Sequence, residues 1–339
     1  MHAERGKQRN PISQCQERQR MKYRKLGRSG LKVSEISLGS WMTYGHTVGE
    51  NTGAKLVDRA FELGINFIDT ANVYEQGAAE SMLGDILPAY PRESYVLATK
   101  AFWPMGSGPN DRGLSRKHVV EQLNASLKRL KQDYVDIFYC HRYDPETPVE
   151  ETLRTIEDFV RQGKVLYVGV SEWSAAQIQE AVQVADKYLL DRIVVNQPEY
   201  SMFNRTIERD VLSVSEKNGI SQVVFSPLAQ GVLTGKYRLG QELPEGSRAS
   251  DPKTNMWIKN YLTDSHLRKV DQLDAVANEL GLSLSSLALA WILRHDSVAS
   301  TLVGATKVSQ LEENVKASGV ELSEEIVGKI EAILTGTEE

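Results

Sequence analysis

Four side chains with complementary acid–base chemistry stand beside short apolar runs of this 339-residue sequence. Asp69, Lys100 and His141 each follow such a run, and Tyr74 lies five residues beyond Asp69. A tyrosine is a weak acid with a pKa of about 10, and a neighbouring ammonium group lowers that pKa because it stabilises the phenolate. An aspartate keeps such a lysine charged, and a histidine can donate a hydrogen bond to a developing oxyanion. Together, the four groups would protonate the oxygen of a carbonyl that accepts a hydride.

Three of these residues also have an ordinary structural interpretation. Asp69 would cap a turn, Lys100 would lie at a solvated strand end, and His141 would hydrogen-bond Asp144. A catalytic cluster is favoured because polar residues follow other apolar runs as well, and the carboxyl ends of parallel strands meet at one edge. These further residues are Ser171, Asn196, Gln197 and Ser226.

The apolar runs are typical of parallel strands buried on both faces, since they are short, nearly continuous and rich in Val, Ile and aromatic residues. Strands are expected at residues 36–38, 65–68, 95–99, 135–139, 165–170, 193–195, 222–225 and 301–303. Amphipathic helices are expected at residues 53–63, 78–87, 115–130, 148–162, 174–185, 208–218, 265–280, 283–294 and 309–318. Eight strand–helix units predict an α/β fold of the closed (β/α)8 TIM barrel type.

An open doubly wound sheet shares this alternation and is the competing fold. The barrel is favoured because residues 37–41, after the first strand, carry one glycine where the dinucleotide-binding fingerprint of the open fold needs three. Residues 23–33 predict an N-terminal β-hairpin cap. Residues 233–264 lack periodicity and predict a long loop after strand 7, a place that is usually functional in a barrel.

Composition restricts the classes of function. A net charge of -5 argues against a nucleic-acid partner, which needs a basic face. No apolar stretch approaches the ~20 residues that cross a bilayer, so no membrane insertion is expected. The two cysteines lack metal-ligand spacing, the other histidines are interpreted as surface residues, and no metal is expected.

The N-terminal residues 1–20 are polar and lack the apolar core of a signal peptide. They are expected to be a disordered leader or an artificial extension, and residues 21–339 to form one domain. The absence of a disulfide framework fits a cytoplasmic protein.

The run GINFIDTANVY, which ends at Tyr74, resembles part of the Asp/Tyr/Lys/His tetrad of the aldo-keto reductases, as do Lys100 in LATK and His141 in YCHR. The resemblance covers the chain from residue 23 onward. It implies a (β/α)8 barrel that reduces aldehydes or ketones to alcohols with NADPH. The implied catalytic residues are Asp69, Tyr74, Lys100 and His141, with Tyr74 as the general acid.

Within that family, the sequence is most similar to the branch that contains the β subunits of voltage-gated potassium channels and their bacterial relatives. Segments 113–118 (GLSRKH), 226–237 (SPLAQGVLTGKY) and 247–250 (SRAS) carry this likeness. The channel subunits have Asn where this chain has His141, which favours a working reductase. The alternative implied by the resemblance is a redox-sensing, cofactor-binding regulatory subunit of a membrane channel.

The resemblance also implies NADPH in an extended pose across the barrel mouth. Asp69 would lie beneath the nicotinamide ribose, and Ser171 and Gln197 would hold the carboxamide, whereas Glu172 stands where many family members have Asn. NADH is the alternative cofactor, because the arginine that many members use at position 310 is missing. The other implied cofactor residues are Gly39, Ser40 and Trp41 in the first loop, Ser226, Leu228, Gly231, Lys236 and Arg248 at the pyrophosphate, and Gly304, Thr306, Gln310, Glu313 and Asn314 at the adenosine.

The expected partner is therefore a small-molecule carbonyl compound, and a homo-oligomer is compatible with the sequence. Three tryptophans in expected loops, Trp41, Trp103 and Trp173, would line an apolar substrate cleft or belong to the core.

Overall fold

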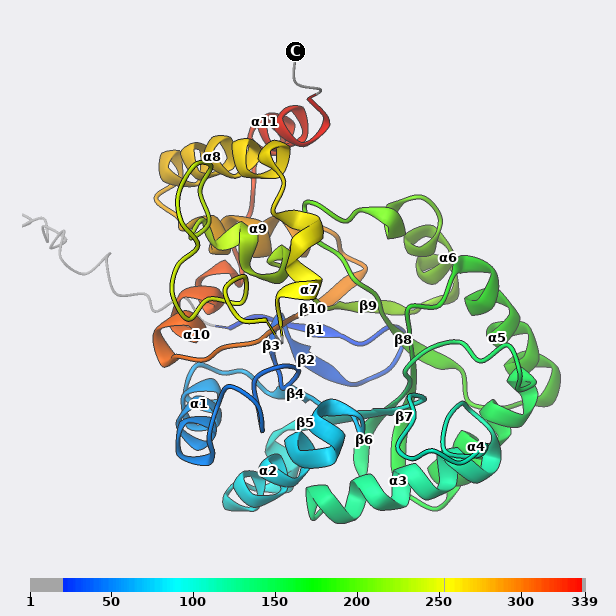
Figure 1. Cartoon of the computed structure of the whole chain (residues 1–339). Coiled ribbons are helices and arrows are strands. Elements are labelled where there is room, and N and C mark those ends of the chain that lie inside the picture. The colour runs from blue at the N-terminus through cyan, green and yellow to red at the C-terminus, as the bar shows by residue number, and fades with distance from the viewer. Residues whose placement is uncertain (1–20, 253, 337–339) are drawn as a thin grey trace, which may run out of the picture.

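A closed barrel of eight parallel strands forms the centre of the molecule (Figure 1). The computed structural model describes residues 21–252 and 254–336, so the expectation for residues 1–20 lies outside the described residues. The strands follow one another around the barrel in the order β10-β3-β4-β5-β6-β7-β8-β9. Their bounds are β3 (Ile36–Gly39), β4 (Phe67–Asp69), β5 (Val96–Ala101), β6 (Val135–Cys140), β7 (Val165–Ser171), β8 (Ile193–Gln197), β9 (Ser221–Val224) and β10 (Val298–Val303). The (β/α)8 barrel is confirmed, and the open doubly wound sheet was the wrong alternative.

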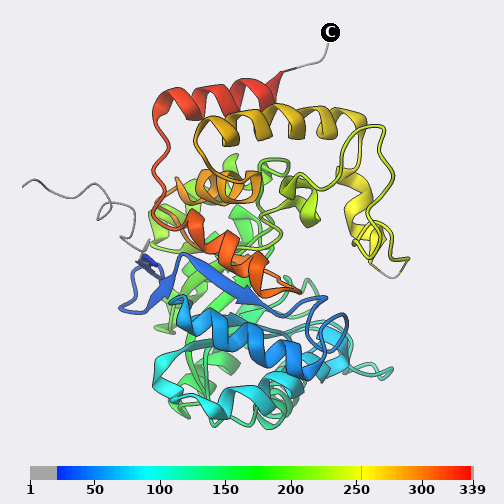
Figure 2. The same cartoon turned by 90° about the vertical axis from the view of Figure 1, so that its left-hand side faces the viewer.

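The helices form an outer layer around this barrel (Figure 1). Most of the connecting helices lie where the sequence predicts them: α1 (Glu50–Glu62), α2 (Ala78–Ile86), α3 (Arg116–Leu130), α4 (Val149–Arg161), α5 (Ala175–Tyr188), α6 (Val211–Asn218), α8 (Asp264–Glu279), α9 (Leu284–Leu293) and α10 (Val308–Asn314). Two helices were not predicted. The expected loop of residues 233–264 contains the short helix α7 (Asn255–Ile258), and α11 (Glu324–Thr335) lies side by side with α8 (Figure 2).

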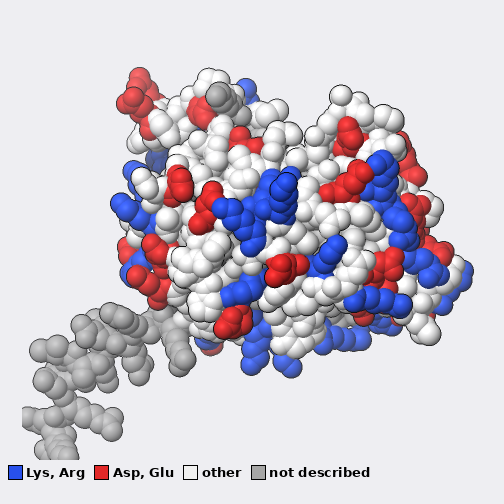
Figure 3. Space-filling view, turned by 90° about the horizontal axis from the view of Figure 1, so that it is seen from below, with Lys and Arg blue, Asp and Glu red and all other residues white. Residues whose placement is uncertain are grey.

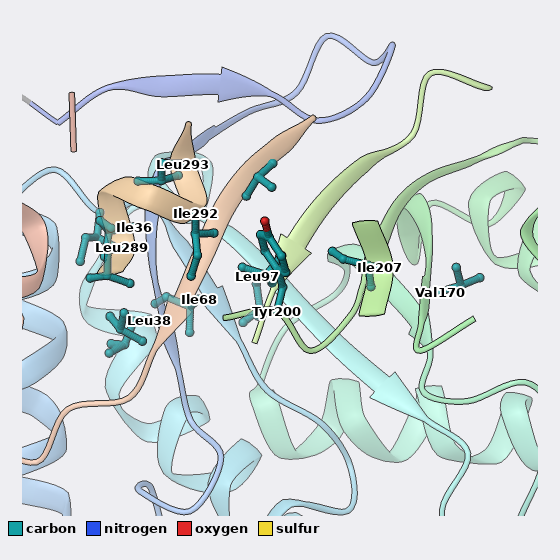
Figure 4. Packing of buried hydrophobic residues seen from close by; sticks show 14 of the residues in the cluster. Ile36, Leu38, Ile68, Leu97, Val170, Tyr200, Ile207, Leu289, Ile292 and Leu293 are labelled. Carbon is teal, nitrogen blue, oxygen red and sulfur yellow. The ribbon is translucent and has the colours of Figure 1, made fainter. Parts of the chain in front are cut away.

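Two apolar layers hold these elements together. Side chains that alternate along each strand point to opposite faces, so one set fills the barrel and the other packs against the helices. Figure 4 shows part of this outer packing, in which strand residues such as Leu97 of β5 and helix residues such as Leu289 of α9 belong to one cluster. The buried inner set consists of Leu26, Val33, Phe67, Val96, Ala98, Ile137, Tyr139, Val195, Val223, Ala299 and Leu302. The ring of Tyr139 fits only because β7 carries Gly169, where a Cβ atom would come within 2.5 Å of that ring.

An antiparallel hairpin of β1 (Tyr23–Lys25) and β2 (Lys32–Ser34) caps the barrel, as predicted. Leu26 and Val33 of this hairpin belong to the inner apolar set. Arg24 donates hydrogen bonds to three backbone carbonyls between residues 293 and 298 and to the buried Glu35 carboxylate at 2.7 Å. Glu35 in turn accepts from the Ser318 hydroxyl and the Gly319 amide. The hairpin is therefore joined to the last part of the chain by polar as well as apolar contacts.

The molecular surface carries both signs of charge. On the face seen in Figure 3, basic and acidic side chains are interspersed. Among residues 21–252 and 254–336, no single helix is both long and apolar enough to cross a bilayer. The helices α8 and α9 have the length and composition only as a pair, and the chain bends by 87° between them.

Candidate active site

The barrel strands place four polar side chains at one end of the apolar interior. Residues two positions apart on a strand share a face, so a polar residue that follows an interior apolar one at this spacing also points inward. This relation holds for Asp69 after Phe67, Lys100 after Ala98, His141 after Tyr139 and Gln197 after Val195. All four lie at or just beyond the carboxyl end of their strand, as expected of reacting groups in a barrel.

The Lys100 amine is the centre of the cluster. Its Nζ donates to the Asp69 carboxylate and to the Thr70 carbonyl oxygen at 2.9 Å, and it lies 3.2 Å from the Tyr74 hydroxyl oxygen. The second carboxylate oxygen of Asp69 accepts from the Gln197 amide at 2.8 Å. Lys100 is fully buried, so its ammonium group contacts the carboxylate and the phenol out of reach of bulk water.

The imidazole of His141 packs against the Tyr74 ring. The ring centroids of His141 and Tyr74 are 5.8 Å apart in an edge-to-face arrangement. Asp144 does not bind His141; its carboxylate accepts from the Leu114 amide at 2.7 Å and from the Thr147 hydroxyl at 2.8 Å. The structural interpretation of His141 as a partner of Asp144 is therefore wrong, and Nδ1 of this buried ring has no partner among the described residues.

Burial controls the proton affinities of the cluster. Burial raises the pKa of Tyr74 above 10.0, although the Lys100 ammonium opposes the rise. The sequence-based expectation of a lowered pKa for Tyr74 was therefore wrong, because desolvation outweighs the neighbouring charge. Burial tends to lower the pKa of Lys100, but Asp69 and Tyr74 outweigh it and the pKa is raised. Burial, with the charges of Lys100 and Arg142, holds the pKa of His141 well below 6.5. At neutral pH the site thus holds an intact phenol, an ammonium and a neutral imidazole.

The loop that carries Tyr74 is held in an unusual conformation. Glu75 and Gln76 both adopt left-handed backbone angles, with φ of 49° and 52°, which side chains with a Cβ atom adopt at an energetic cost. The Glu75 carboxylate lies 3.4 Å from Nδ1 of His46 in the first βα loop. The chain turns at these two residues directly after Tyr74, whose hydroxyl lies 3.2 Å from the Lys100 amine at the barrel mouth.

The expected cofactor residues lie on neighbouring loops around the same mouth. The loops after β9, β10 and β3 are adjacent because those strands are consecutive in the barrel. They carry residues 226–248, 304–314 and 39–41, which include every implied cofactor residue except Asp69, Ser171 and Gln197. Ser171 and Gln197 contact each other, because the Ser171 hydroxyl donates to the Gln197 carbonyl oxygen at 2.8 Å. A Cβ atom on Gly304 would lie 3.4 Å from the Thr43 side chain, so the segment after β10 runs close to the first loop.

The loop after β9 forms a cationic cradle. Gln230 joins its parts: its amide donates to the Ser226 hydroxyl at 2.6 Å, and its carbonyl oxygen accepts from the Arg248 guanidinium. Arg248 has no ion pair with a described residue, and burial lowers its pKa. Gly231 has φ of 99°, and a Cβ atom there would lie 3.4 Å from the Lys236 amine. Two cations that have no paired acid in the described part of the chain, beside backbone turns, fit the phosphates of a dinucleotide.

Two further segments, the first loop with Ser40 and the segment after β10, would contact the same dinucleotide. The Ser40 hydroxyl is buried and has no partner among the described residues, so it is available to a bound group. Gln310 folds back so that its side-chain oxygen accepts from the Thr306 amide at 2.9 Å. The Glu313 carboxylate forms a 2.5 Å ion pair with Lys316, and Asn314 is buried. The Gln310 contact lies at the start of α10, whereas Glu313 and Asn314 are its last two residues.

The three tryptophans divide between the two expected places, the rim of the barrel and the core. Trp41 packs edge-to-face on Trp257 of α7 at 5.9 Å, so the unpredicted helix lies against the first loop. The Trp103 ring lies 6.3 Å from the ring of His141 and is partly exposed. Trp173 is 2% exposed and packs on Tyr143, so it belongs to the core and not to a cleft.

Two residues of the site were not predicted from the sequence, and His118, which lies outside the site, was wrongly predicted to be on the surface. Gln230 and Trp257 were not predicted, although Gln230 is the polar residue at the centre of the SPLAQG segment and Trp257 is a large apolar residue in a loop. His118, interpreted from the sequence as a surface residue, has no solvent exposure. Helical spacing places it on the inner face of α3, which the sequence pattern alone indicates once the helix bounds are known.

The comparisons with known proteins agree with this geometry. Residues 35–335 match the model described as the aldo/keto reductase family. The probable voltage-gated potassium channel subunit beta of Oryza sativa subsp. japonica is 45% identical over 319 residues, which are 93% of this chain and 97% of that protein. The Arabidopsis thaliana protein of the same name is 44% identical with the same coverage. The putative voltage-gated potassium channel subunit beta of Schizosaccharomyces pombe is 43% identical over 93% of this chain and 94% of that protein. The chain therefore belongs to the aldo/keto reductase family of oxidoreductases.

Proposed function

We propose that this protein reduces aldehydes or ketones to alcohols, with NADPH as the hydride donor and Tyr74 as the proton donor. The observation that carries the proposal is the 3.2 Å contact between the Lys100 amine and the Tyr74 hydroxyl, in a cluster where the lysine also binds Asp69. A phenol is a useful acid only if its phenolate is stabilised as the proton leaves, and a fixed, buried ammonium supplies that stabilisation.

Each residue of the cluster has a distinct part in the reaction. The Tyr74 hydroxyl transfers its proton to the carbonyl oxygen, and Lys100 stabilises the phenolate that forms until solvent returns a proton. Asp69 keeps Lys100 charged and oriented. Because the pKa of His141 is well below 6.5, its neutral ring donates a hydrogen bond to the carbonyl oxygen without competing as an acid. The raised pKa of Tyr74 keeps the phenol protonated before the substrate reacts.

The cofactor residues are assigned in the same proposal. When bound, NADPH supplies the hydride that adds to the carbonyl carbon. Arg248 and Lys236 would bind its phosphates, and Ser226 and Gly231 shape the turn beside them. Ser171 and Gln197 would hold the carboxamide, and the residues of 304–314 would contact the adenosine. Arg248 and Lys307 are the cations available to a 2′-phosphate, which favours NADPH over NADH.

The variant Tyr74→Phe tests the assignment. It removes one oxygen atom from the site, so we expect turnover to disappear while the affinity for NADPH, measured by fluorescence titration, stays close to that of the wild type. Tyr90→Phe is the matched control, because the Tyr90 hydroxyl binds Asp58 on the outer surface. Retained turnover in Tyr74→Phe, or loss of NADPH binding, would show that the assignment is wrong.

A second function is favoured by the names of the relatives. The protein would then be a cofactor-binding regulatory subunit of a membrane channel that senses the redox state of its nicotinamide. Single-turnover kinetics with purified protein distinguish the two: an enzyme oxidises bound NADPH rapidly with at least one aldehyde of a panel, whereas a regulator oxidises it slowly with all of them.

A further inference from the structure

The rim of the barrel carries an arginine that the proposed reaction leaves without a part. Arg142 directly follows His141, and its side chain is half-buried. The central carbon of its guanidinium lies 5.4 Å from the centroid of the Trp103 ring. Its Nη1 donates to the carbonyl oxygen of His141 at 2.6 Å and lies 3.4 Å from the Ser171 hydroxyl. The backbone and a tryptophan thus hold the group in place.

The Arg142 guanidinium has no acid in direct contact among the described residues. It forms no ion pair there, and its Nε and Nη2 groups have no hydrogen-bond acceptor. The acid whose pKa it affects, Glu172, is held instead by the Glu199 amide at 2.5 Å. Half-buried arginines are normally paired, because removing a charge from water is unfavourable. An N–H fork with two free donors in one plane matches the two oxygens of a carboxylate.

The position of this fork relative to the reacting groups suggests what binds there. The His141 ring packs edge-to-face with both the Tyr74 ring and the Trp103 ring, at centroid distances of 5.8 Å and 6.3 Å. A substrate whose carbonyl oxygen contacts Tyr74 and His141 thus has the Trp103 ring within reach. Its far end would reach the guanidinium that lies over that ring.

We propose that Arg142 binds a carboxylate group of the substrate, so that the site selects aldehydes or ketones that carry a carboxylate beyond an apolar or aromatic spacer. This inference rests on the proposed function, because Tyr74 and His141 define where the carbonyl lies. Arg142 is a specificity-determining residue in this account and takes no part in proton transfer.

A matched pair of substrates tests the inference. One is 4-carboxybenzaldehyde and the other is its methyl ester, which is similar in shape and uncharged. In Arg142→Met, kcat/KM for the carboxylate should fall roughly 10- to 100-fold, as expected for loss of a hydrogen-bonded charge pair. The ester should change by less than about threefold, since it makes no charged contact. Arg142→Lys should retain part of the preference, because a lysine keeps the charge and loses the fork.

The control variant is Arg154→Met. Arg154 also packs on an aromatic ring, that of Tyr188, but it lies on the outer helix α4 and pairs with Glu150 at 2.8 Å. The Arg154→Met variant loses the same positive charge as Arg142→Met but far from the mouth, so both substrates should react as with the wild type. Equal losses of both substrates in Arg142→Met would show that the residue merely positions the His141 turn and would overturn the inference, as would no loss at all.

A binding measurement separates this inference from the proposed function. If the wild type turns over neither substrate, the proposed function fails, and calorimetry with 4-(hydroxymethyl)benzoate on NADP⁺-loaded protein still decides the role of Arg142. Tighter binding to the wild type than to Arg142→Met supports the carboxylate site. Equal affinity, or an absence of binding to both, refutes it.

Discussion

Replacement of Lys100 by Met tests the charged pair on which the proposed mechanism depends. The Lys100 side chain has no solvent exposure, and that of Asp69 is 3% exposed. Without the ammonium, the carboxylate keeps the Gln197 amide at 2.8 Å, and the Thr70 carbonyl loses its 2.9 Å donor. Removing one partner of a buried pair typically destabilises a protein by about 3–5 kcal/mol. This is a large share of the roughly 5–15 kcal/mol that keeps a protein folded.

The double variant Lys100→Met/Asp69→Asn supplies the internal control, because it removes both charges together. We expect it to recover about 2 kcal/mol or more of the lost stability, since no unpaired charge remains in the interior. Turnover should not return, because the group that stabilises the Tyr74 phenolate is still missing.

Urea denaturation followed by tryptophan fluorescence measures these differences. With a slope of about 3 kcal/mol per molar urea, the single variant should unfold at a midpoint about 1–2 M lower than the wild type. An unchanged midpoint for Lys100→Met would refute the burial argument. Full activity in the double variant would refute the role of the lysine in catalysis.

Three further predictions concern the site and the barrel. The pKa of Tyr74 is raised above 10.0 and that of His141 lies well below 6.5. We therefore expect kcat/KM for aldehyde reduction to be flat from about pH 7 to about pH 9 and to fall only at more alkaline pH, where the phenol loses its proton. A change of kcat/KM with pH near neutrality would contradict both the raised pKa of Tyr74 and the lowered pKa of His141. Gly169→Ala should destabilise the barrel by about 1–3 kcal/mol, because its methyl group overlaps the ring of Tyr139, and an unchanged melting temperature would count against this. Arg248→Met should raise the Kd for NADPH roughly tenfold or more through loss of a phosphate contact, and equal Kd values in a fluorescence titration would exclude Arg248 from the cofactor site.

The barrel could be predicted because its strands are buried on both faces and therefore stand out as apolar runs. α11 was missed although Ser323 caps it and Ile326, Ile330 and Ile333 follow at helical spacing. That signal is present in the sequence. α7 is different, since four helical residues in a segment of turns have no periodicity to detect.

The site was predictable in its members and less so in its energetics. Motif spacing indicated Asp69, Tyr74, Lys100 and His141, and the structure brings them together. The contact between Gln197 and Asp69 joins residues 128 positions apart and depends on how the barrel closes, which a local pattern does not contain. The direction of the Tyr74 pKa was mispredicted for the same reason, because the degree of burial is a property of the closed barrel.

The hairpin cap bears on how the chain is made. Arg24 and Glu35 find their partners 269 to 284 residues later in the chain, at Leu293 and Gly319. Ribosomes release a protein from its N-terminus, so these polar contacts of the cap cannot form until synthesis is almost complete. Until β10 is made, β3, the first strand of the barrel, is an open sheet edge, and such edges pair readily with other chains. We therefore expect the nascent polypeptide to depend on chaperones until its final strand emerges and seals the fold.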